Sequence, residues 1–151
     1  MYGGGLMLVL DGLDTLFVVW AFIFQMILIV HFALRKRFFD SYTLKIGWIV
    51  YALCIPAVVI SIIILIGGKS WSFWLGGFLF LIFAAYGYWV DYVKGIQWRN
   101  PLDRSIMFPY VTLYLATIMF YWWPLALLSR PLWYVFGGLF VIGTVLNISS
   151  H

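Results

Sequence analysis

The sequence predicts an all-α membrane protein, a polytopic bundle of five transmembrane helices. Three observations lead to this fold class: long stretches without charge, an apolar composition, and apolar runs that do not alternate with polar residues. The five charge-free stretches are 15–34, 46–68, 70–90, 105–129 and 131–150. Each approaches the ~20 apolar residues that carry a helix across a ~30 Å hydrocarbon core.

Composition leads to the same fold class. Hydrophobic residues make up 66% of the chain, charged residues 9%, and the mean hydropathy is +1.06. Soluble domains carry roughly 45–50% apolar and about 25% charged residues. Runs such as 58–65 lack the alternation of barrel strands, so the spans are expected to be helices. We expect a single membrane domain, 1–151, with spans at 15–34, 46–66, 71–90, 108–128 and 132–148.

Polar residues between the stretches delimit each predicted helix. Asp11 and Asp14 precede the first helix and are suited to cap it. The short loop 35–45 makes the first two helices antiparallel neighbours. The segment 91–105 is the longest polar segment, and among the loops it is the best candidate for contact with soluble partners.

The last four predicted helices contain a weak internal sequence similarity. Residues 69–81 align without gaps with residues 130–142, and the alignment matches two Gly-Gly pairs. A duplicated two-helix unit would explain the match. So would the shared need for a basic anchor, an aromatic belt and small packing residues in two helices that enter from one side.

Lysine and arginine predict the orientation. Seven of the nine lie in the first and third loops, at Arg35, Lys36, Arg37, Lys45, Lys94, Arg99 and Arg104. The positive-inside rule therefore places these loops in the cytoplasm, the N-terminus outside and the C-terminus inside, in a cytoplasmic (inner) membrane. The net charge of +4 follows from these loops. We expect no nucleic-acid partner, because the aromatic residues lie in the spans.

The residues of catalytic and cofactor sites are scarce. The chain has no glutamate, and its five aspartates all fall at or beyond the predicted helix ends. Its histidines are His31 and His151, whereas a membrane haem usually needs two on facing helices. Cys54 is the single cysteine. We therefore expect no enzyme activity, no cofactor and no metal site.

Hydroxyl groups form a regular pattern in the fourth predicted span. They belong to Tyr110, Tyr114, Thr117 and Tyr121. Their spacing of four, three and four residues places them on one stripe about 16 Å long, which should face the bundle interior. The stripe either lines a pocket for an amphiphile, with Trp122 and Trp123 at its outer mouth, or bonds helices together, with the tryptophans as interface anchors.

Gln25 is a polar residue at the midpoint of the first span. Asp14 lies eleven residues earlier and points in nearly the same direction. This face either lines a hydrated path or bonds Gln25 to a neighbouring helix. We count Gln25 among the candidate ligand-binding residues, together with the hydroxyl stripe and the two tryptophans.

These observations favour a non-catalytic membrane protein. The expected role is binding, either of lipids or another apolar small molecule or of partner transmembrane helices, as an accessory subunit or homo-oligomer. A ligand binder predicts a closed cavity beside Tyr114 and Tyr121, and a partner subunit predicts unused glycines on the surface. The alternative is an oligomeric channel or transporter for a small solute, lined by the tyrosine stripe.

Overall fold

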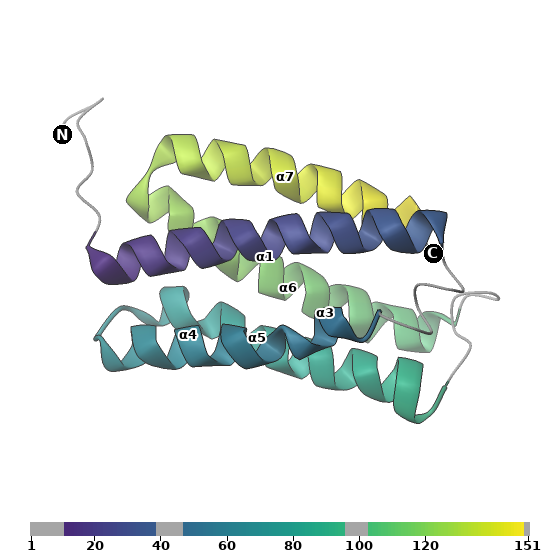
Figure 1. Ribbon diagram of the computed structural model, residues 1–151. Coiled ribbons are helices and arrows are strands. Elements are labelled where there is room, and N and C mark those ends of the chain that lie inside the picture. Colours follow the sequence, from purple (N-terminus) through teal and green to yellow (C-terminus); the bar gives the residue numbers. More distant parts are fainter. Residues whose placement is uncertain (1–10, 39–46, 96–102, 150–151) are drawn as a thin grey trace.

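The computed structural model describes residues 11–38, 47–95 and 103–149, and within these ranges it contains helices and no strand (Figure 1). The helices are α1 (Gly12–Arg37), α3 (Ile49–Ala52), α4 (Cys54–Ile66), α5 (Trp71–Tyr88), the π-helical turn η1 (Trp89–Val93), α6 (Arg104–Leu128) and α7 (Arg130–Ser149). They make five segments long and apolar enough to cross a membrane, because α3 continues into α4 and α5 into η1. The predicted five-helix membrane bundle is confirmed.

Several helices are longer than their apolar stretches. We expected the first span to begin at residue 15, but α1 begins at Gly12. A capping box explains this start. The Asp11 side chain accepts from the backbone N–H of Asp14 at 2.7 Å, and the Asp14 side chain accepts from the backbone N–H of Asp11. The fourth span was expected from residue 108, but α6 begins at Arg104. Asp103 caps it by accepting from the Ser105 backbone N–H at 3.0 Å.

The second and third spans are irregular near the same end of the bundle. Leu53 separates α3 from α4, and Pro56 follows one turn later. Because proline has no N–H, it cannot bond the carbonyl of Ala52, and the helical ladder is interrupted there. In η1 the backbone hydrogen bonds join residues five apart instead of four, as the Lys94 N–H donates to the Trp89 carbonyl at 2.8 Å.

Neighbouring helices follow the order of the chain. α4 packs on α5, α5 on α6, and α6 on α7, while α1 lies along α7 and closes the bundle against α4 and α6 (Figure 1). α5 and α6 therefore have neighbours on both sides. The 18-residue apolar window of α7 is 17% buried and that of α1 is 44% buried, so α7 presents most of its surface outward.

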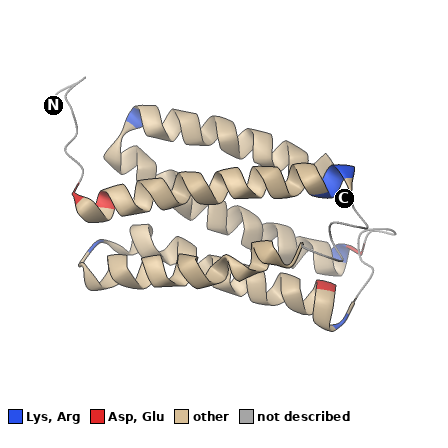
Figure 2. Ribbon diagram, in the orientation of Figure 1, with Lys and Arg blue, Asp and Glu red and all other residues tan. Residues whose placement is uncertain are grey.

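Charged residues gather at the two ends of the bundle (Figure 2). One end, called the basic end below, carries the five basic residues Arg35, Lys36, Arg37, Lys94 and Arg104 and the two acidic residues Asp91 and Asp103. The opposite end carries two of each kind, Asp11, Asp14, Lys69 and Arg130. The helix ends that flank the first and third loops thus share one end of the bundle. Which end faces the cytoplasm stays a prediction.

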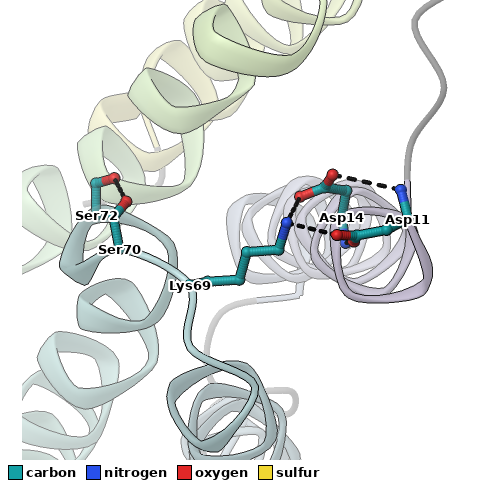
Figure 3. A network of polar contacts seen from close by, with 5 residues as sticks. All are labelled: Asp11, Asp14, Lys69, Ser70 and Ser72. Carbon is teal, nitrogen blue, oxygen red and sulfur yellow. Dashed lines mark hydrogen bonds and ion pairs between the residues drawn. The ribbon is translucent and has the colours of Figure 1, made fainter.

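An ionic network closes the opposite end (Figure 3). Lys69, in the turn between α4 and α5, places its Nζ 2.7 Å from Asp11 Oδ2 and 2.9 Å from Asp14 Oδ1. The bond from Lys69 lowers the pKa of Asp11, and the bonds to the two carboxylates raise the pKa of Lys69. This network ties the start of α1 to the α4–α5 turn.

Candidate functional site

The tyrosine stripe of α6 faces the bundle interior, as its spacing predicts. The exposed fractions are 2% for Tyr110, Tyr114 and Tyr121 and 1% for Thr117. Phenylalanine rings fill the space beside the stripe. Ring centroids of Phe83 and Tyr110 are 4.9 Å apart, those of Phe24 and Tyr121 are 5.1 Å apart, and those of Phe32 and Tyr114 are 5.7 Å apart. The stripe is part of a packed aromatic core.

The hydroxyls of the stripe bond differently from one another. Tyr121 accepts a hydrogen bond from the Trp20 indole of α1 at 3.0 Å. Thr117 donates to the Leu113 carbonyl of its own helix at 2.8 Å. The Tyr114 hydroxyl makes no hydrogen bond to another described residue. Among these three hydroxyls, that of Tyr121 therefore bonds to another helix.

The two tryptophans expected at a common mouth diverge. Trp122 turns toward α7, where its indole donates to the Trp133 carbonyl at 2.9 Å and stacks on the Trp133 ring at 5.0 Å. Trp123 is 42% exposed and packs against Trp71 of α5, with ring centroids 5.6 Å apart. They occupy different sides of α6, so they do not frame a single opening onto the stripe.

Gln25 meets the stripe in the middle of the bundle. It is fully buried, and its Nε2 donates to the Leu139 carbonyl of α7 at 3.1 Å. Gly143 lies between the two groups, because a Cβ there would be 2.7 Å from Gln25 Nε2 and 3.7 Å from the Tyr114 hydroxyl. The structure therefore brings Gln25 and Tyr114 together, whereas Asp14 belongs to the ionic network at the opposite end.

Arg35 lies inside the helical bundle, which corrects its assignment to the first loop. Its side chain is 2% exposed and donates to Asn147 Oδ1 of α7 at 2.6 Å. The guanidinium also lies over the Phe32 ring, 5.1 Å from its centroid. A seven-residue period could have revealed this position, since Arg35 continues the buried stripe of Ala21 and Leu28.

A groove between the second and third spans was not predicted. Its volume is about 260 Å³, and it opens at the surface. The lining residues are Trp48, Tyr51, Ala52, Cys54, Leu81, Ala84, Ala85 and Tyr88. The exposed part of this lining is wholly apolar. Both walls lie beside backbone irregularities, the break at Leu53 and the π-helical turn, and such turns often mark functional sites.

One wall of the groove ends on a polar pair. Tyr51 lines the groove, and its hydroxyl donates to Asp91 Oδ2 in η1 at 2.6 Å. Gly87 makes room for this ring, because a Cβ there would lie 2.6 Å from a Tyr51 ring carbon. The rings of Tyr88 and Tyr92 stand 6.5 and 6.1 Å from that of Tyr51. The Tyr51 ring therefore lies in the wall of the groove, and the Tyr51–Asp91 bond lies next to the groove and not in its exposed lining.

A second groove, also about 260 Å³, lies on the other side of α3. Met26, Ile27, Val30, His31, Ile49 and Val50 line it. His31 is 5% exposed and contacts the Phe32 ring. The first turn of the second span thus stands between two grooves.

Among the described residues, no three histidine, cysteine, aspartate or glutamate side chains are grouped in a way that could hold a metal ion. In comparisons with protein families, curated proteins and solved structures, no family model, no curated protein and no solved structure matches this chain.

Proposed function

We propose that the protein is a non-catalytic, multi-pass membrane protein that binds the acyl chain of a membrane lipid in the groove between α3–α4 and α5. The observation that carries this proposal is the apolar groove of about 260 Å³ that opens at the surface and is lined in part by Tyr51, whose hydroxyl donates to Asp91. An acyl chain is the ligand available at that depth, because the surrounding solvent is hydrocarbon.

The two parts of the site suit the two parts of an amphiphile. Ala52, Ala84 and Ala85 keep the groove open for methylene groups, which gain dispersion contacts with its walls. Because the acyl chain comes from lipid, close packing and not transfer from water supplies the affinity. The Tyr51–Asp91 pair lies toward the basic end, where lipid headgroups would be found. Aromatic residues such as Trp48 and Tyr88 are enriched at this boundary in membrane proteins. The bound lipid would therefore lie parallel to the helices.

The filled core favours this groove over the tyrosine stripe. A ligand beside Tyr114 or Tyr121 would have to displace the rings of Phe24, Phe32 or Phe83. Either groove accepts a chain without such a movement. The candidate residues on α6 and Gln25 therefore serve, in this proposal, to hold the scaffold on which the groove is built.

The glycines also weigh in favour of lipid over a partner helix. Gly76 lies against the backbone of Phe120, and Gly77 against Ala57 and Ser61. Gly137 faces the Trp122 ring, and Gly143 faces Gln25. Of the glycines we expected a partner to use, Gly138 alone has open space around it. One open glycine gives a second helix little room for close approach.

Native mass spectrometry of the protein released from bilayers tests the proposal. We expect a retained lipid on the unaltered chain and much less on Ala85→Phe, because the new ring occupies the groove and removes the packing contacts that hold the acyl chain. Ala126→Phe is the matched control, since Ala126 is exposed on α6 and does not line the groove. Equal retention by both variants, or no lipid on the unaltered chain, would contradict the proposal.

A further inference from the structure

We propose that Gln25, Tyr114 and Thr144 form a binding site for a single water molecule in the middle of the bundle, where α1, α6 and α7 meet. Three polar atoms of these residues are buried and make no hydrogen bond to another described residue: Gln25 Oε1, the Tyr114 hydroxyl and Thr144 Oγ1. This site is independent of the lipid groove, which lies between α3–α4 and α5.

The three groups converge around Gly143. A Cβ on Gly143 would lie 2.7 Å from Gln25 Nε2 and 3.7 Å from the Tyr114 hydroxyl, so both side chains end beside this glycine. Thr144 is the next residue on α7, and its hydroxyl is close enough to Tyr114 to interact with it. Their geometry nevertheless falls short of a hydrogen bond. Three helices therefore contribute one polar atom each to the same small region.

Energetics favour a shared partner for these atoms. A buried polar group without a hydrogen bond is costly, and a membrane interior supplies no solvent to satisfy it. One water molecule satisfies all three, since it can donate to the Gln25 amide oxygen and accept from the Tyr114 hydroxyl. It can either donate to the Thr144 hydroxyl or accept from it. Three partners are also the usual number for a buried water.

The site is suited to a neutral guest. Gln25, Tyr114 and Thr144 carry no charge, and the buried Arg35 guanidinium is close enough to act on Tyr114. A cation there would meet repulsion without a carboxylate to offset it. Water matches the chemistry of the site and introduces no charge into the membrane interior.

Polar groups continue from the site toward the basic end. Asn147 follows Thr144 by about one helical turn on α7 and accepts the hydrogen bond from Arg35. In the other direction the stripe continues to Tyr121, whose ring packs against Phe24 and Phe17 at 5.1 and 5.9 Å. Polar side chains therefore lie on the basic-end side of the site, and the rings of Tyr121, Phe24 and Phe17 lie on the other side.

Solid-state NMR of the full chain in lipid bilayers is the direct test. Magnetisation transferred from water should reach the Gln25 side-chain amide. The Trp20 indole N–H, which donates to Tyr121, should show no signal transferred from water at the same mixing time. Gly143→Ala should weaken the Gln25 signal, because the added Cβ would lie 2.7 Å from Gln25 Nε2 and 3.7 Å from the Tyr114 hydroxyl and so crowd the site while all three polar residues remain. A Gln25 amide that receives no water signal in the unaltered chain would overturn the proposal.

Stability supplies a second readout whose sign distinguishes a wet site from a dry one. If water is bound, Thr144→Val should lower the ratio of folded to unfolded protein by about fivefold to tenfold, the usual loss for one net hydrogen bond. Removing an unbonded hydroxyl from a dry site would instead leave the ratio unchanged or raise it, and would contradict the proposal. Thr117→Val is the matched control, since that hydroxyl bonds its own helix. It should change the ratio less than Thr144→Val.

Discussion

Two pairs of helices in this bundle are joined by different kinds of contact. Between α4 and α5 the backbones approach closely, because Gly77 faces Ala57 and Ser61 without a side chain between them. Between α1 and α7 two hydrogen bonds from long polar side chains join the helices, from Gln25 to the Leu139 carbonyl and from Arg35 to Asn147, beside the ring pair of Phe22 and Phe136. Close approach of backbones distinguishes the first pair, and particular hydrogen bonds distinguish the second.

The difference follows from the solvent. Lipid tails are as apolar as leucine, so burial of apolar surface does not drive two helices together inside a membrane. Close packing and interhelical hydrogen bonds remain as the sources of affinity. The first source makes a helix pair sensitive to added volume, and the second makes it sensitive to a lost partner. Substitutions of each kind therefore test the comparison.

The largest effect is expected from volume added between α4 and α5. In Gly77→Ala the new Cβ would lie 2.6 Å from the Ala57 carbonyl oxygen, a backbone atom that cannot move cheaply. We expect the free energy of unfolding to fall by about 3 kcal/mol, at the upper end of the usual cost of overpacking. Denaturant titration in mixed micelles, followed by circular dichroism, measures it.

Gly138→Ala is the matched control for this prediction, because nothing lies within 4 Å of the position of its Cβ. Alanine forms helix better than glycine, so we expect this variant to be as stable as the unaltered chain or up to about 1 kcal/mol more stable. Equal losses in both variants would mean that Gly77 acts through helix propensity, and the comparison would fail.

The second prediction removes a partner from the α1–α7 pair. Asn147→Leu takes away the oxygen that accepts from Arg35 at 2.6 Å, inside a region where Arg35 is 2% exposed. We expect a loss of about 2 kcal/mol in the free energy of unfolding, the typical value for a hydrogen bond to a charged group. The same titration measures it.

A double variant separates the bond from the shape of the side chain. Arg35→Met in the Asn147→Leu background replaces the remaining charge with an apolar group of similar length, and it should recover part of the loss. Additive losses from the two substitutions would show that the Arg35–Asn147 bond does not hold α1 to α7.

A smaller loss is expected where α1 meets α6. Tyr121→Phe removes the oxygen that accepts from the Trp20 indole at 3.0 Å and leaves a buried N–H without that partner. We expect about 1 kcal/mol, within the range measured for hydrogen bonds between membrane helices. Trp20→Phe combined with Tyr121→Phe should cost less than the sum of the two single substitutions. Double-mutant analysis of unfolding free energies decides between these outcomes.

Much of the fold could be predicted because charge and hydropathy act over whole segments. Charge-free stretches gave five spans, and the spacing of Tyr114, Thr117 and Tyr121 placed them on a face that proves to be buried. The ends were less predictable, since local bonds decide them. Asp11 and Asp103 extend α1 and α6 beyond their apolar stretches by capping, which hydropathy does not register.

The candidate site was less predictable, because it depends on contacts between distant residues. Arg35 looks like a loop residue until Asn147, 112 positions later, is placed beside it. The groove between α3–α4 and α5 depends on the break at Leu53, the π-helical turn and the approach of Gly87 to Tyr51. Pro56 and Gly87 were the signals present in the sequence, and neither indicates alone which helix its neighbour would be.

The smallest effect is expected at the ionic network, which links α1 to the turn between α4 and α5 and so joins the two kinds of helix pair. Lys69 lowers the pKa of Asp11, so the stabilisation from Asp11 is complete above its unfolded pKa of about 4 and is lost as the pH falls through the lower folded value. The pKa of Lys69 is raised, so its contribution is complete below about pH 10 and is lost as the pH rises through the higher folded value. Asp11→Asn should therefore remove the acid limb that Asp11 contributes and weaken the alkaline limb, where Lys69 keeps Asp14 as its partner, whereas Lys69→Gln should flatten both limbs. Thermal unfolding in nanodiscs at several pH values and salt concentrations measures this, and high salt should reduce the effect because the network is partly exposed. If Lys69→Gln instead destabilises the protein as much as Gly77→Ala does, then the joint between the two helix pairs, and not their internal packing, holds the bundle together.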